Sequence, residues 1–141
     1  MNGTPPAAST SANCGPGSGL SAEEVGFTKN HSSFVVLTRL KGSESNPALT
    51  PQLNQPNQYI IRFVHGADLT AAAKDTKVAV TWIHTSSHTP KPYPADSVQQ
   101  QADGSYLATI TFKGKSGGTY EIHVDLTEGT TEDEHVVQVS I

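Results

Sequence analysis

The chain has 141 residues, a formal net charge of −4, 12 glycines and 9 prolines, with 35% hydrophobic and 16% charged residues. This length suits one domain with a modest core, and the glycine and proline content favours a turn-rich fold over a helical one. The mild acidity argues against a nucleic-acid partner, and no apolar run approaches the roughly 20 residues that a transmembrane helix needs.

The N-terminal part of the chain is rich in Gly, Pro, Ser, Thr and Ala without periodicity, which predicts a flexible, disordered tether. We place this tether at 1–31 and a single folded domain at 32–141. Such tethers separate exported bacterial domains from membrane anchors, so one alternative is a lipoprotein whose acylated cysteine lies at or before Met1. Cys14 is a poor candidate for that cysteine, because no apolar stretch precedes it. A membrane contact is therefore expected only through a lipid anchor outside the given chain.

From about Ser32 onward, short apolar runs with a period near two alternate with turn-forming residues, which predicts β-strands. Trp82 shares one strand face with two valines and is the natural centre of a core. The pair Asp103-Gly104 between two extended runs is a strong hairpin signal. The predicted fold is all-β, a seven-stranded antiparallel sandwich. The expected strands are 34–40, 58–65, 77–84, 96–101, 106–113, 120–126 and 136–141.

The segment Gly118-Thr119-Tyr120-Glu121-Ile122-His123-Val124 resembles a signature strand of immunoglobulin-like domains, in which a tyrosine two positions before a core residue forms a tyrosine corner. Trp82 fits the core tryptophan of these domains. The resemblance implies an immunoglobulin-like sandwich. The core pair that a disulfide usually bridges would here be apolar, Ile122 with Ile61 or Phe63.

The C-terminal half, with KVAVTWIH, DGSYLATITF and GGTYEIHVDL, resembles the YtkA-like and FixH-like exported domains over roughly 58–141. This resemblance implies a small extracytoplasmic bacterial protein, linked to respiratory-oxidase assembly or to copper handling. Members of the family often carry methionine and histidine together in the loop that corresponds to 84–90, whereas this chain has histidines there and no methionine. Because thioether ligands select copper(I), this departure argues against a copper(I) role.

His84 and His88 are four residues apart, and the Thr-Ser-Ser between them is flexible enough to let both imidazoles reach one divalent ion. A complete site needs further ligands, and the turns that a sandwich places at the same end supply no histidine. Two interpretations follow, a copper or zinc site at His84 and His88 or a pair of solvated histidines.

The opposite end of the predicted sandwich gathers carboxylates and imidazoles, a combination that suits Ca²⁺ or Zn²⁺. A run such as Glu132-Asp133-Glu134 is, however, usually a solvated hairpin tip. His123 lies beside Glu121 and Asp125 on the outward face of its strand, which favours a surface histidine. The alternative metal ligands at this end are His65, Asp68, Glu132 and His135.

Tyr93, flanked by Pro92 and Pro94, is the one tyrosine that the pattern places at the surface, since the others have the periodicity of core or corner residues. A single exposed aromatic ring is by itself a weak indication of carbohydrate or peptide stacking.

The sequence gives little indication of catalysis or of nucleotide binding. Cys14 is distant in sequence from any activating histidine, and no phosphate-binding glycine loop occurs. The pattern G-x-S-x-G occurs once, at 114–118, but in a turn between two predicted strands, whereas a nucleophile elbow lies between a strand and a helix. We expect no enzyme, but a non-catalytic binding module in the periplasm or at the cell surface that holds an unknown protein partner through loops or sheet edges. The alternative is a periplasmic protein that handles copper or zinc with its histidine-containing loops. A third interpretation is a structural spacer.

Overall fold

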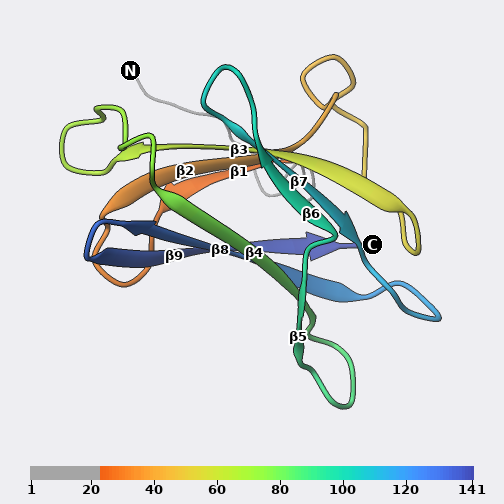
Figure 1. Ribbon diagram of the computed structural model, residues 1–141. Coiled ribbons are helices and arrows are strands. Elements are labelled where there is room, and N and C mark those ends of the chain that lie inside the picture. Colours follow the sequence, from red (N-terminus) through yellow and green to blue (C-terminus); the bar gives the residue numbers. More distant parts are fainter. Residues whose placement is uncertain (1–22) are drawn as a thin grey trace, which may run out of the picture.

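The computed structural model describes residues 23–141, which form two β-sheets packed against each other (Figure 1). The described residues contain no helix, and hence none able to cross a membrane. The strands are β1 (Glu23–Phe27), β2 (Phe34–Leu40), β3 (Pro56–His65), β4 (Lys77–His84), β5 (Pro92–Pro94), β6 (Ser97–Gln100), β7 (Tyr106–Thr111), β8 (Thr119–Glu128) and β9 (Thr131–Ser140).

One sheet has five strands in the order β1-β2-β3-β7-β6, and the other has four in the order β5-β4-β8-β9. All neighbouring strands are antiparallel. Without β1 and β5, this is the strand order of constant-type immunoglobulin domains. The predicted all-β antiparallel sandwich is therefore confirmed, with one additional outer strand on each sheet beyond the seven expected.

The additional strand β1 lies within the range 1–31 that the composition assigns to the tether. Its five residues pair with β2 in continuous register, from Glu23 opposite Arg39 to Phe27 opposite Val35. The sandwich thus begins earlier in the chain than expected, because backbone pairing orders a short segment whose own pattern is too weak to predict a strand. The tether predicted for residues 1–22 lies outside the described residues.

The core lies between the sheets and follows the predicted alternation. β8 shows it most clearly, since Tyr120, Ile122, Val124 and Leu126 are fully buried and the residues between them are not. Trp82 is 5% exposed and meets the ring of Phe112 edge-on, with 5.7 Å between ring centroids. The expected apolar pair also lies in the core, since Ile61 on β3 and Ile122 on β8 are both fully buried.

Tyr120 forms the predicted tyrosine corner at the turn between β7 and β8. Its hydroxyl donates a long hydrogen bond, 3.5 Å, to the carbonyl oxygen of Lys113, seven residues earlier. A Cβ atom on Gly114 would lie 2.7 Å from the Tyr120 hydroxyl oxygen. The corner therefore requires a residue without a side chain at this point of the turn.

The acidic run at 132–134 is not the solvated hairpin tip that the sequence favoured. The β8–β9 turn is shorter than expected and consists of Gly129 and Thr130, with Gly129 at a φ of 61°. Glu132, Asp133 and Glu134 consequently lie within β9, where the strand's alternation turns Asp133 inward to 3% exposure.

Candidate functional site

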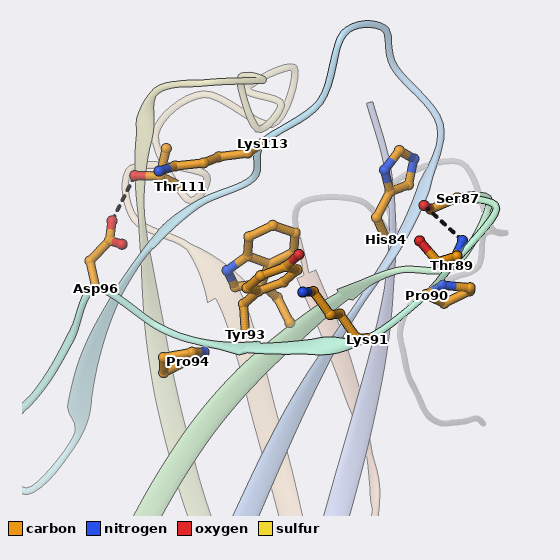
Figure 2. Close-up of a pocket in the computed structure, with 11 residues that line it drawn as sticks. His84, Ser87, Thr89, Pro90, Lys91, Tyr93, Pro94, Asp96, Thr111 and Lys113 are labelled. Atoms are coloured by element: carbon orange, nitrogen blue, oxygen red, sulfur yellow. Dashed lines mark hydrogen bonds between the residues drawn. The ribbon is translucent and has the colours of Figure 1, made fainter.

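A cleft of about 360 Å³ opens between the two sheets beside β5. Its walls come from β4 and β5 of one sheet and from the end of β7 in the other, and the β4–β5 loop closes one side (Figure 2). Pockets of a few hundred cubic ångströms that combine aromatic side chains with a few polar groups are typical sites for small ligands.

The aromatic wall is a stacked pair formed by Trp82 and Tyr93. These residues lie directly opposite each other in the β4–β5 pairing, and their ring centroids are 4.9 Å apart with 27° between the planes. Trp82 is buried, whereas Tyr93 is 41% exposed. Pro92 and Pro94 restrict the backbone on both sides of Tyr93 and suit an edge strand, because proline donates no ladder hydrogen bond. The chain thus holds a partly exposed tyrosine ring in place, with Trp82 against one face and Lys91 over the ring.

The opposite wall of the cleft is polar. Thr111 donates a hydrogen bond of 2.6 Å to Oδ2 of Asp96, and the other carboxylate oxygen accepts none from the described residues. Figure 2 shows Asp96, Thr111 and Lys113 together on this side of the cleft. Lys91 lies over the Tyr93 ring, with its Nζ atom 5.3 Å from the ring centroid. A ligand on Tyr93 would therefore meet a carboxylate oxygen and two lysines.

His84 lies at the other side of the cleft and His88 in the exposed loop beyond it. The His84 ring stacks on Tyr120 with 4.1 Å between centroids and 13° between planes. The loop between β4 and β5 is tied to the start of β8, where Thr85 donates to the carbonyl oxygen of Thr119 from both its backbone nitrogen, at 2.9 Å, and its hydroxyl, at 3.0 Å. The pair His84 and His88 as copper or zinc ligands stays a prediction.

At the opposite end of the sandwich, His65 belongs to a hydrogen-bond network with neighbouring side chains. Nε2 of His65 lies 2.8 Å from Glu128, and Nδ1 lies 2.9 Å from the Thr70 hydroxyl. Asp68 accepts hydrogen bonds from the hydroxyl and backbone nitrogen of Thr70. Glu128 also accepts the Ala73 backbone hydrogen, and these bonds lower the pKa of its carboxyl.

The other two members of this predicted metal set lie apart from that network. Glu132 is exposed, and His135 is 4% exposed beneath β1, where a Cβ atom on Gly26 would be 3.2 Å from the imidazole. Burial lowers the pKa of His135, which favours the neutral ring. Across residues 23–141, no group of three or more His, Cys, Asp or Glu side chains is placed to hold a metal ion. The structure thus does not bring His65, Asp68, Glu132 and His135 together.

Two polar clusters have roles that the sequence did not indicate, and Asp133 is the centre of the first. Its carboxylate accepts hydrogen bonds from the Thr28 hydroxyl at 2.8 Å and from the backbone nitrogens of Asn30, His31 and Ser33 at 2.9–3.1 Å. Burial alone would raise the pKa of Asp133, but these bonds lower it well below its usual range. This carboxylate holds the β1–β2 turn against β9.

The second cluster lies on the outer face of the four-stranded sheet around His123. Its ring nitrogens are each 3.0 Å from a carboxylate oxygen, Nδ1 from Glu134 and Nε2 from Glu121. Lys29 Nζ is 2.6 Å from Glu134, and burial together with the Glu134 carboxylate raises the pKa of Asp125 to about 6. The predicted surface histidine is therefore a partly buried member of a network that joins the β1–β2 turn to β8 and β9.

Comparisons with known proteins give fold-level similarities only. No protein-family model and no curated protein matches the chain. A DUF4426 family protein from Pseudomonas aeruginosa is structurally similar, with 14% sequence identity, a TM-score of 0.49, and coverage of 85% of this chain and 94% of that chain. A copper-bound variant of FetP from uropathogenic Escherichia coli is similar at 9% identity, with a TM-score of 0.48 and coverage of 85% and 90%. The resemblance to YtkA-like and FixH-like domains is not confirmed by these matches.

Proposed function

We propose that this chain is a non-catalytic binding module of the extracytoplasmic compartment and that the cleft beside β5 is its ligand site. The observation that carries the proposal is the stacked pair of Tyr93 and Trp82, which exposes a supported aromatic ring opposite a polar wall. The extracytoplasmic location rests on the resemblance of the sequence to exported YtkA-like and FixH-like domains.

The cleft suits a ligand with one flat ring face and polar groups at its edge. Tyr93 is already held against Trp82, so little side-chain freedom remains to be lost when a ring stacks on it. Asp96 offers an oxygen acceptor and Lys91 and Lys113 offer donors around that ring.

The single tryptophan of the chain, Trp82, provides the test, because a ligand on Tyr93 changes the surroundings of the indole beneath it. We would titrate the protein with a panel of neutral saccharides, acidic saccharides and aromatic acids and follow the fluorescence of Trp82. We expect saturable changes for a subset of the panel and their loss in Tyr93→Ala. The matched control is Tyr106→Phe, a tyrosine outside the cleft, which should bind as the wild type does. Saturation that is unchanged in Tyr93→Ala, or none across the panel, would overturn the proposal.

A protein partner is a second candidate, favoured by the outer strand β1. Val25 and Phe27 are each 59% exposed there, and among the described strands β1 is the last of its sheet. An extended apolar segment of another protein could add to this strand. Peptides selected from a random display library on the wild type should fail to bind Phe27→Asp, and a selection that yields only peptides insensitive to this substitution would contradict the second candidate.

A further inference from the structure

The charges of the chain are unevenly distributed between the two ends of the sandwich. The loops at 41–55, 85–91 and 112–118 lie at the same end, since Asn54 and Gly114 bond to each other in both directions and Thr85 bonds to Thr119. These loops hold four lysines and one glutamate, although the whole chain has a net charge of −4. The cleft therefore opens at the locally basic end of an acidic protein.

Two of these lysines line the cleft itself. Lys91 lies over Tyr93, and Lys113 lies beside Thr111 on the opposite wall (Figure 2). Both side chains are exposed, and neither makes a salt bridge within the described part of the chain. Two ammonium groups that line one cleft and have no salt bridge favour an anionic ligand.

The same cleft also presents a carboxylate, and this limits the kind of anion. Oδ2 of Asp96 accepts the Thr111 hydroxyl, which leaves Oδ1 to accept a hydrogen bond from a ligand. A ligand there must offer a donor such as a hydroxyl group, because a second acceptor would face a negative oxygen. An anion without a hydroxyl group, such as sulfate or benzoate, lacks that donor.

From these three features, and resting on the proposed function, we infer that the cleft binds an acidic saccharide through one hexuronate-type ring. The apolar face of the sugar ring takes the place of the exposed Lys91 side chain over Tyr93, its carboxylate pairs with the displaced Lys91 and with Lys113, and a ring hydroxyl donates to Asp96. A volume of about 360 Å³ is at the small end of ligand pockets, which fits one or two sugar rings rather than a long chain.

The test removes the negative charge of the ligand while keeping its sugar ring. We would titrate the full chain with short oligosaccharides of galacturonate, mannuronate and guluronate, each beside its fully methyl-esterified form, and follow Trp82 fluorescence at low salt. We expect at least one acid to bind about tenfold more tightly than its ester, as two partly exposed ion pairs allow, and the advantage to shrink as salt is added.

Two variants test whether the difference in affinity between acid and ester arises in the cleft. The double substitution Lys91→Gln with Lys113→Gln should bring the affinity for the acid down to that of the ester. Lys77→Gln, an exposed lysine at the far end of β4, is the matched control and should retain the difference. Equal thermal melting of the wild type and both variants would show that the fold is intact.

The outcomes separate this inference from the function on which it rests. Equal affinity for acid and ester, or an advantage that survives the double substitution, would overturn the acidic-saccharide assignment and leave the cleft as a binding site. Binding of aromatic acids at Tyr93, with no binding of any saccharide, would do the same. Displacement of a bound oligosaccharide by inorganic phosphate alone would also overturn the acidic-saccharide assignment. If no member of either panel binds, both proposals fail.

Discussion

Asp133 shows how one carboxylate organises a distant turn. Its two oxygens accept four hydrogen bonds from residues of the β1–β2 turn, a hundred or more positions earlier in the sequence. The sequence could not predict this role, because three consecutive acids are typical of a solvated turn. Only the length of the neighbouring turn decides which of the three faces inward, and that turn is Gly129 and Thr130.

We predict that Asp133→Ala lowers the free energy of unfolding by roughly 3 kcal/mol, because several buried donors lose their acceptor together. Chemical denaturation at neutral pH measures this loss. Glu132→Ala, on the same strand but exposed, should change the stability by less than about 0.5 kcal/mol. A loss below about 1 kcal/mol in Asp133→Ala would contradict the role of the carboxylate.

The same residue predicts a pH dependence with a defined sign. The pKa of Asp133 is lower in the folded protein than in the unfolded chain, so the ionised carboxylate stabilises the fold at neutral pH. This contribution is lost as the pH falls below the unfolded value of about 4. The stability difference between the wild type and Asp133→Asn should therefore be largest near neutral pH and narrow in acid. A stability difference that stays constant down to the lowest pH at which the protein folds would contradict this prediction.

Among the elements, β5 is the clearest case of a segment whose sequence signal was only partly informative. The flanking prolines of Tyr93 predicted its exposure, which the structure confirms. The stacking on Trp82 could not be predicted, because it depends on the register of a three-residue strand against β4. By contrast, the strands β7 and β8 follow their strict alternation, so their buried faces were predictable from the sequence.

The turn between β7 and β8 provides a prediction at the same scale. Gly114→Ala should destabilise the fold by about 1–3 kcal/mol, because the new methyl group would overlap the Tyr120 hydroxyl. In a Tyr120→Phe background the same substitution should cost less, since the overlapping oxygen is gone. A double-mutant cycle of unfolding free energies measures this coupling, with Ser116→Ala in the same turn as the control. Additive effects of the two substitutions would contradict the contact.

At the scale of the whole molecule, the two ends of the sandwich have different characters. The strand order was predictable from seven alternating segments, and with it the grouping of loops at each end. That grouping placed His65 and the acidic residues together, but it could not show that Glu128 and Thr70 occupy both His65 ring nitrogens. At the other end, the sequence could not show that Trp82, Tyr93 and two lysines line the same cleft, because that cleft forms only where the two sheets pack together.

The most direct test is an NMR titration of the ¹⁵N-labelled protein with the tightest-binding member of the ligand panel. The measured quantities are the chemical shifts of the backbone and indole N–H groups. We predict saturable shifts concentrated at the Trp82 indole, Lys91, Tyr93 and Thr111, around the cleft beside β5. Shifts centred instead on Val25 and Phe27, or on His65 at the opposite end, would contradict the cleft as the ligand site.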